Sequence, residues 1–98
     1  MSWRSDEARA FSDWMASLKD LRARARIAER LRRVAISGSL GDYKDIGDGL
    51  SEFRFHFGPG YRVYFRRRGA EVVILLGGGG TGSQSRDIKA ATALAKEV

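Results

Sequence analysis

Charged and apolar side chains alternate along residues 50–66, and this pattern is the clearest chemical signal in the chain. Side chains point alternately to opposite faces of a β-strand, so the alternation gives the two faces different chemistry. One face would hold the apolar side chains of Phe53, Phe55, Phe57, Tyr61, Val63 and Phe65. The other face would hold Glu52, Arg54, His56, Arg62, Tyr64 and Arg66.

The polar face fits a phosphodiester substrate. Guanidinium groups bind phosphate through paired hydrogen bonds, and tyrosine can stack on a base. RNA cleavage removes a proton from the 2′-hydroxyl, builds negative charge on the phosphorane and protonates the 5′-oxygen. We expect Arg54 and Arg62 to stabilise the charge and His56 to transfer protons, because an unperturbed imidazole titrates near pH ~6.5. The plain alternative is a solvated sheet face with a cross-strand Glu52–Arg66 ion pair.

The stretch between the two alternating runs predicts a hairpin with its loop at residues 58–60. Counting outward from that loop gives the pairs Phe57 with Tyr61, His56 with Arg62, Arg54 with Tyr64, and Glu52 with Arg66. A slip of one residue would turn every phenylalanine to water, so burial of the apolar face fixes the parity of the register.

Two helices are expected before this hairpin. In residues 5–18, one apolar stripe is formed by Phe11, Trp14, Met15 and Leu18. Ser5 is a suitable N-cap for this helix, and Asp6 and Glu7 suit its positive end. The link to the next helix, around Lys19 and Asp20, is short and predicts an antiparallel helix pair.

Residues 21–36 predict the second helix, with Asp20 as its N-cap and a glycine-containing stop at residues 37–41. Its apolar side is formed by Ile27, Leu31 and Val34. Its other side is basic and holds Arg22, Arg24, Arg26, Arg30, Arg32 and Arg33. These arginines fit a nucleic-acid groove, and they fit equally a solvated face or a landing site for an acidic partner.

The remaining elements are expected to be short strands and one last helix. Strands are predicted at residues 42–46, 50–57, 61–66 and 71–76, with turns at 47–49 and 67–69. Residues 83–96 predict a helix with Ile88, Ala91 and Leu94 facing inward. The order α-α-β-β-β-β-α indicates an α+β fold with helices on one face of an antiparallel sheet.

Composition limits the class of protein. The chain has 98 residues, which predicts one domain over residues 1–98, and its net charge of +6 suggests a polyanionic partner. Cysteine is absent and histidine occurs once, so we expect no disulfide, no metal site and no cofactor. There is no apolar run long enough to cross a membrane, and the start of the chain does not resemble a secretory signal, so we expect a cytoplasmic protein.

The glycine-rich run at residues 77–82 follows a predicted strand and precedes a helix, as phosphate-binding loops do. It lacks the lysine pattern of a P-loop, and a chain of this size lacks the surrounding βαβ unit. We therefore do not expect nucleotide binding there.

Taken in order, these segments resemble the HigB-like addiction module killer proteins of the RelE/ParE toxin superfamily. The resemblance rests on residues 11–15 with 18–20, on 23–27, on 41–44, on 52–65, and on Ser83-Gln84 followed by Asp87-Ile88. It covers nearly the whole chain.

The resemblance implies two antiparallel helices packed on a curved antiparallel sheet, with a short C-terminal helix. It implies a type II toxin that acts as a metal-independent, ribosome-dependent mRNA endoribonuclease. Its partners would be mRNA, the ribosome and a helix-turn-helix antitoxin, without a membrane or a small-molecule cofactor. By resemblance, the catalytic cations include Lys44 beside Arg54 and Arg62, and the RNA-binding set is Tyr61, Tyr64, Arg66, Thr81 and Gln84.

Two departures from the family pattern leave alternatives open. Relatives begin with a strand, for which only residues 1–4 remain here, and they commonly have Asp-Lys where this chain has Gly80-Thr81. A threonine cannot replace an ammonium group at phosphate. The alternatives are therefore a ParE-like gyrase poison, or a catalytically weakened homologue that only binds its antitoxin.

Overall fold

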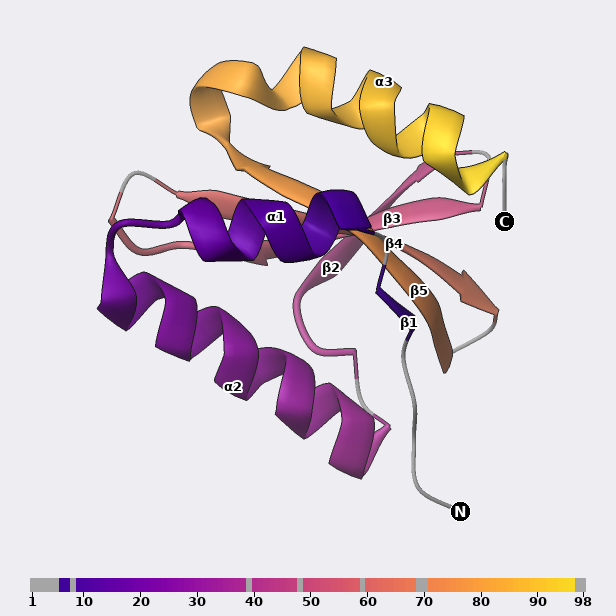
Figure 1. Cartoon of the computed structure of the whole chain (residues 1–98). Helices are drawn as coiled ribbons and strands as arrows, with labels where there is room; N and C mark the ends of the chain where they lie inside the picture. The colour runs from indigo at the N-terminus through magenta and orange to yellow at the C-terminus, as the bar shows by residue number, and fades with distance from the viewer. Residues whose placement is uncertain are drawn as a thin grey trace.

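The computed structural model of the chain contains a five-stranded sheet with helices on both sides (Figure 1). The structure describes residues 6–7, 9–38, 40–47, 49–58, 60–68 and 71–96. The strand order is β1-β5-β4-β3-β2, antiparallel except for the parallel pair β1 and β5. The strands are β1 (Asp6–Glu7), β2 (Tyr43–Gly47), β3 (Leu50–Phe55), β4 (Tyr61–Arg68) and β5 (Glu71–Gly80). The helices are α1 (Arg9–Ser17), α2 (Leu21–Ser37) and α3 (Gln84–Ala95), with a 3-10 turn at Thr81–Ser83.

The predicted α+β fold is confirmed, but the helices are not on one face of the sheet. The larger core lies between the sheet and helices α1 and α2; it contains Phe11, Ile27, Leu31, Phe53, Phe65 and Leu75. Helix α3 covers the opposite face, where Leu50, Tyr64, Leu76 and Ala91 form a second core. The inward side predicted for α3 is right, since Ala91 is buried and Ile88 and Leu94 pack beside it.

Helix α2 begins and ends as predicted. The side chain of Asp20 accepts hydrogen bonds from the amides of Arg22 and Ala23. At the other end, Gly38 has φ of 75° and its amide donates to the carbonyl of Val34, a left-handed termination that glycine adopts without steric cost.

The start of α1 was predicted wrongly. Asp6 and Glu7 form strand β1 opposite Ile74 and Leu75 of β5, and α1 begins only at Arg9. The expected absence of a first strand is therefore also wrong. A two-residue strand pairs only through its backbone with a distant segment, so alternation along the sequence cannot reveal it. The proposed cap, Ser5, lies outside the described residues.

The β3–β4 hairpin has the predicted parity but a register shifted by two residues. Phe55 lies opposite Tyr61, Arg54 opposite Arg62, Glu52 opposite Tyr64, and Leu50 opposite Arg66. Strand β3 ends at Phe55, two residues before its predicted end, and β4 begins at Tyr61. A shift of two leaves every side chain on its predicted face but changes its cross-strand partner.

The glycine run belongs to a strand and does not form a loop. Strand β5 continues through Gly80, four residues beyond its predicted end. A Cβ atom on Gly78 would lie 2.4 Å from the ring of Trp14, and one on Gly79 would overlap the carboxylate of Asp87. The glycines therefore let α1 pack closely on one side of β5 and α3 on the other. In the described part of the chain, no helix is long and apolar enough to cross a membrane.

Candidate functional site

Two arginines lie directly opposite each other on the face of the sheet that α3 partly covers. Arg54 of β3 pairs with Arg62 of β4, and Arg62 pairs in turn with Gly79 of β5. Each arginine is held by a carboxylate of this chain. We call Arg54, Arg62 and His56, together with Asp42, the carboxylate that contacts two of them, the cation row.

Asp42 connects Arg54 to His56. One oxygen of Asp42, Oδ1, accepts a hydrogen bond of 3.2 Å from Nη2 of Arg54, and the other, Oδ2, lies 2.9 Å from Nε2 of His56. The hydrogen bond from His56 and then that from Arg54 hold the pKa of the Asp42 carboxyl below its usual range. The His56 side chain is 72% exposed, so its ring reaches solvent beside the arginine pair.

Glu52 forms an ion pair with Arg62. The Nε atom of Arg62 donates to Oε2 of Glu52 at 3.2 Å, and the Glu52 side chain is only 2% exposed. The predicted pair Glu52–Arg66 does not form, because the observed register places Tyr64 opposite Glu52 and Arg66 opposite Leu50. Arg66 instead donates through Nη1 to the carbonyl of Ala95, at the end of α3.

Tyr64 lies beside Glu52 under α3 and is fully buried. The predicted stacking of Tyr64 on a base needs exposed ring surface, and the ring has none in this structure. Burial, reinforced by the charges of Glu52 and Asp87, raises the pKa of Tyr64 to about 12. Among the residues that the structure describes, neither its hydroxyl nor Oε1 of Glu52 has a hydrogen-bond partner.

The start of α3 closes this end of the face. The hydroxyl of Ser83 donates to Oδ2 of Asp87, whose carboxylate lies against Gly79, the strand neighbour of Arg62. Beside this contact is a hollow of about 420 Å³ lined by residues 82–86, including Gln84. Gln84 therefore lines this hollow at the start of α3, whereas the side chain of Thr81 lies outside what the structure describes.

The two other predicted residues differ in position. Lys44 of β2 is exposed and lies opposite Glu52, on the same face as the arginines. Tyr61 lies on the other face, where its ring packs 5.6 Å from that of Phe57 at the edge of the larger core. The structure therefore gathers Lys44, Arg54, His56 and Arg62, but not Tyr61.

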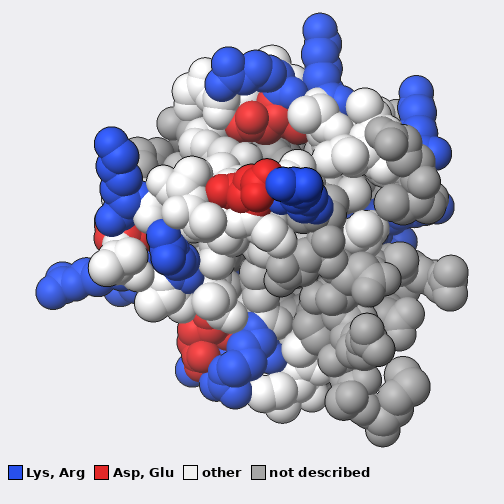
Figure 2. Space-filling model, viewed as in Figure 1, with Lys and Arg blue, Asp and Glu red and all other residues white. Residues whose placement is uncertain are grey.

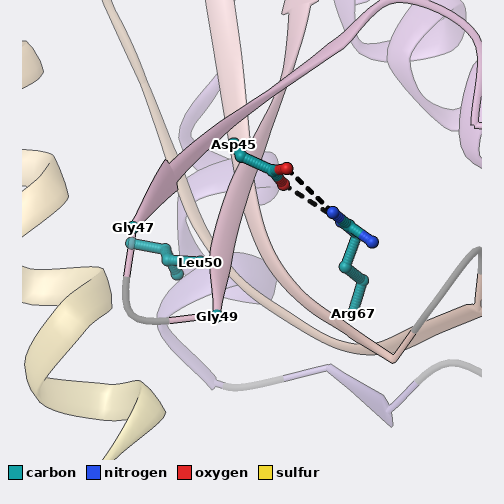
Figure 3. A pocket seen from close by; sticks show the side chains of 5 residues that line it. All are labelled: Asp45, Gly47, Gly49, Leu50 and Arg67. Atoms are coloured by element: carbon teal, nitrogen blue, oxygen red, sulfur yellow. Dashed lines mark hydrogen bonds and ion pairs between the residues drawn. The ribbon is translucent and has the colours of Figure 1, made fainter.

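A second polar cluster lies at the other end of the sheet, on the face of Tyr61. Figure 3 shows its ion pair between Asp45 and Arg67. Arg67 of β4 donates twice to Asp45 of β2, at 2.8 and 3.1 Å, and the hydroxyl of Ser51 on β3 donates to the same carboxylate. These bonds lower the pKa of Asp45, the contact with Arg67 contributing most. The cluster ties three strands together beside a hollow of about 340 Å³.

The sequence pattern gave no role to Asp42, Ser83 or Asp87. Asp42 has the same parity as Lys44, so it would have been placed beside Arg54 had the β2–β3 register been known. The contact of Ser83 and Asp87 with Gly79 depends on how α3 folds back, which no local pattern encodes. Among the residues that the structure describes, no group of acidic or histidine side chains is arranged to hold a metal ion.

No protein-family model matches the chain. An uncharacterized protein of Haemophilus influenzae is 44% identical over 88 residues, which cover 90% of this chain and 88% of that protein. The chain belongs to the same family as that protein. A solved structure of a mutant Escherichia coli toxin RelE, in the free state, has a TM-score of 0.61 and 21% identity, and covers 91% of this chain and 97% of that chain.

The chain has the RelE fold. The expected architecture of two N-terminal helices, an antiparallel sheet and a C-terminal helix is thereby confirmed. The more specific expectation, a HigB-like member, stays a prediction. Within the RelE fold of this chain, the cation row combines two guanidinium groups with an imidazole that reaches solvent, which is the set of groups that phosphodiester chemistry needs.

Proposed function

We propose that this protein is a toxin of the RelE type that cleaves mRNA on the ribosome and is neutralised by a helix-turn-helix antitoxin. The observation that carries the proposal is the pairing of Arg54 with Arg62 beside His56, in a chain with the RelE fold. The fold match supports the class of protein, and the cation row supports the chemistry.

In the proposed reaction the arginines stabilise charge and His56 transfers protons. The Nε2 atom of His56 faces Asp42, so the carboxylate would favour the tautomer with hydrogen on Nε2. The other ring nitrogen, Nδ1, would then be the proton acceptor. Arg54 and Arg62 would then contact the phosphate oxygens as negative charge builds on phosphorus. Lys44 and Gln84 would bind the flanking RNA.

The test is cleavage of a reporter mRNA by purified protein, with and without ribosomes. Arg54→Ala and His56→Ala should each reduce cleavage by about 100-fold or more. Lys89→Ala, on the exposed side of α3, is the matched control and should cleave normally. Unchanged cleavage in both site variants, or inhibition of gyrase without RNA cleavage, would overturn the proposal.

A protein that only binds its antitoxin is the second candidate. It is favoured by the carboxylates that already occupy both arginines, because RNA phosphate would have to compete with Asp42 and Glu52. Normal growth of cells that produce the chain without an antitoxin would support it. Thr81→Lys should then restore toxicity, since it supplies the ammonium group common in relatives.

A further inference from the structure

The outer side of α2 holds an apolar stripe that none of the described residues covers. The helix buries Ala23, Ile27, Leu31 and Val34 against the core. Its opposite side exposes Leu21, Ala25, Ala28 and Ile36. Leu21 is 68% exposed and Ile36 is 72% exposed, and these are the exposed large apolar side chains of the described residues. At 3.6 residues per turn all four fall on one side of the helix, and Arg32 lies on the same side between Ala28 and Ile36.

Helix α2 also holds most of the positive charge of the protein. It contains six arginines and one glutamate, a net charge of +5, whereas the whole chain has +6. Figure 2 shows Lys and Arg side chains around the lower left of the molecule, where α2 lies in Figure 1. The charge is therefore concentrated beside the apolar stripe.

Few of these charges are neutralised within the chain. Glu29 accepts from Arg32 at 2.7 Å and lies 3.6 Å from Arg33, so the helix's one carboxylate is already shared. Arg24 and Arg30 each donate through Nη2 to backbone carbonyls, which leaves the positive charge of both side chains without a carboxylate. No carboxylate contacts Arg22 or Arg26 among the described residues, and Arg26 lies 4.8 Å from the ring of Phe57.

A shallow hollow runs along the arginine flank of the stripe. It has a volume of about 360 Å³ and is lined by Ala25, Glu29 and the arginines Arg26, Arg30 and Arg33. Arginine side chains present aliphatic stems as well as charge, so they can cover an apolar partner and pair with its carboxylates at once.

We propose that the outer side of α2 is a docking surface for an acidic amphipathic helix of a partner protein. Leu21 and Ile36 would contact leucine-like residues about four turns apart on the partner helix, and Arg22, Arg26 and Arg33 would contact aspartate or glutamate beside them. RNA would use the charge but leave Leu21 and Ile36 exposed, so the combination favours a protein.

The docking surface and the cation row are on opposite sides of the sheet. Helix α2 covers the face of Phe53 and Phe55, and Arg54 and Arg62 point to the other face, which α3 partly covers. The inference does not depend on the RNA chemistry proposed for the cation row. A partner on α2 alone would leave Arg54, His56 and Arg62 uncovered.

The experiment uses the full chain and a fluorescent synthetic helical peptide with leucine at its first and fourth heptad positions and glutamate elsewhere. Binding is measured by anisotropy, with a lysine-for-glutamate peptide and an RNA oligonucleotide as competing probes. The acidic peptide should bind and the basic one should not. Tighter binding of the RNA than of the peptide, unaffected by changes at Leu21 and Ile36, would overturn the proposal.

Two double variants separate the parts of the surface. Leu21→Ser with Ile36→Ser should weaken peptide binding about tenfold or more, and Arg22→Glu with Arg26→Glu should weaken it similarly. Lys89→Glu with Lys96→Glu makes the same charge change on exposed residues of α3 and should bind as the natural chain does. All six changes are at exposed positions, so the variants should fold. An equal loss of binding in the α3 control would mean that net charge alone drives binding, and it would reject the docking site.

Discussion

Arg54 and His56 are joined through one side chain, Asp42, whose two oxygens each contact one of them. The three residues come from the bend before β2, from β3 and from the turn after β3. Asp42 therefore positions both Arg54, the proposed charge-stabilising group, and His56, the proposed proton-transfer group. The same carboxylate also neutralises part of their positive charge.

Replacing Asp42 should release both groups. In Asp42→Ala, nitrogen NMR of the imidazole should show that hydrogen no longer prefers Nε2. Because His56 is the only histidine in the sequence, its imidazole signals need no assignment. Asp42→Asn can still accept a hydrogen bond and should keep the preference in part. An unchanged preference in Asp42→Ala would remove Asp42 from the proposed mechanism.

The stability contributed by Asp42 should depend on acid pH. Its pKa in the folded protein is lowered, first by His56 and then by Arg54, so the unfolded state binds the proton more readily. The contribution is present above the unfolded pKa of about 3.9 and is lost as pH falls through the folded value. Urea unfolding of the natural chain and Asp42→Asn should converge below that pH, with a small difference above it because the site is exposed.

Removing Arg62 should destabilise the fold as well as the site. Glu52 would keep a buried carboxylate without its cation, which costs about 3 kcal/mol. Glu52→Gln with Arg62→Ala should recover part of this loss in a urea unfolding series. Activity of Arg62→Ala must therefore be compared with that double variant, and equal stability of the two would contradict the pairing.

Tyr64→Phe should leave stability unchanged or raise it. The Tyr64 hydroxyl is buried and has no hydrogen-bond partner in the described part of the chain, so its removal deletes a desolvated polar group and no bond. A loss of more than about 1 kcal/mol would indicate a partner that binds the hydroxyl.

The raised pKa of Tyr64 predicts a separate effect at alkaline pH. Because the folded value is about 12, the folded state keeps a proton that the unfolded state loses near pH ~10. The contribution is complete below pH ~10 and is lost as pH rises toward 12. The difference in absorbance at 295 nm between the natural chain and Tyr64→Phe should therefore show a midpoint near 12.

The glycines of β5 should differ sharply in their tolerance of alanine. Gly78→Ala puts a methyl group into the ring of Trp14 and should cost about 2 kcal/mol or more. Gly77→Ala, next to it on the same strand, meets nothing within 4 Å and is the matched control. In a Trp14→Ala background the cost of Gly78→Ala should largely disappear, and an unchanged cost there would show that the ring is not its cause.

The sequence by itself determined the α+β class, helix α2 with its Asp20 and Gly38 ends, and the two faces of the β3–β4 hairpin. These features follow from local periodicity, capping and the parity of side chains along a strand. The tertiary structure alone decided which side chains and segments of this chain contact one another. A two-residue shift brought Arg62 to Arg54 and to Glu52, a two-residue strand joined β5, and α3 folded over Tyr64. The strand register and the packing of α3 on the sheet depend on contacts between distant segments. Alternation of side chains along the chain does not encode such contacts.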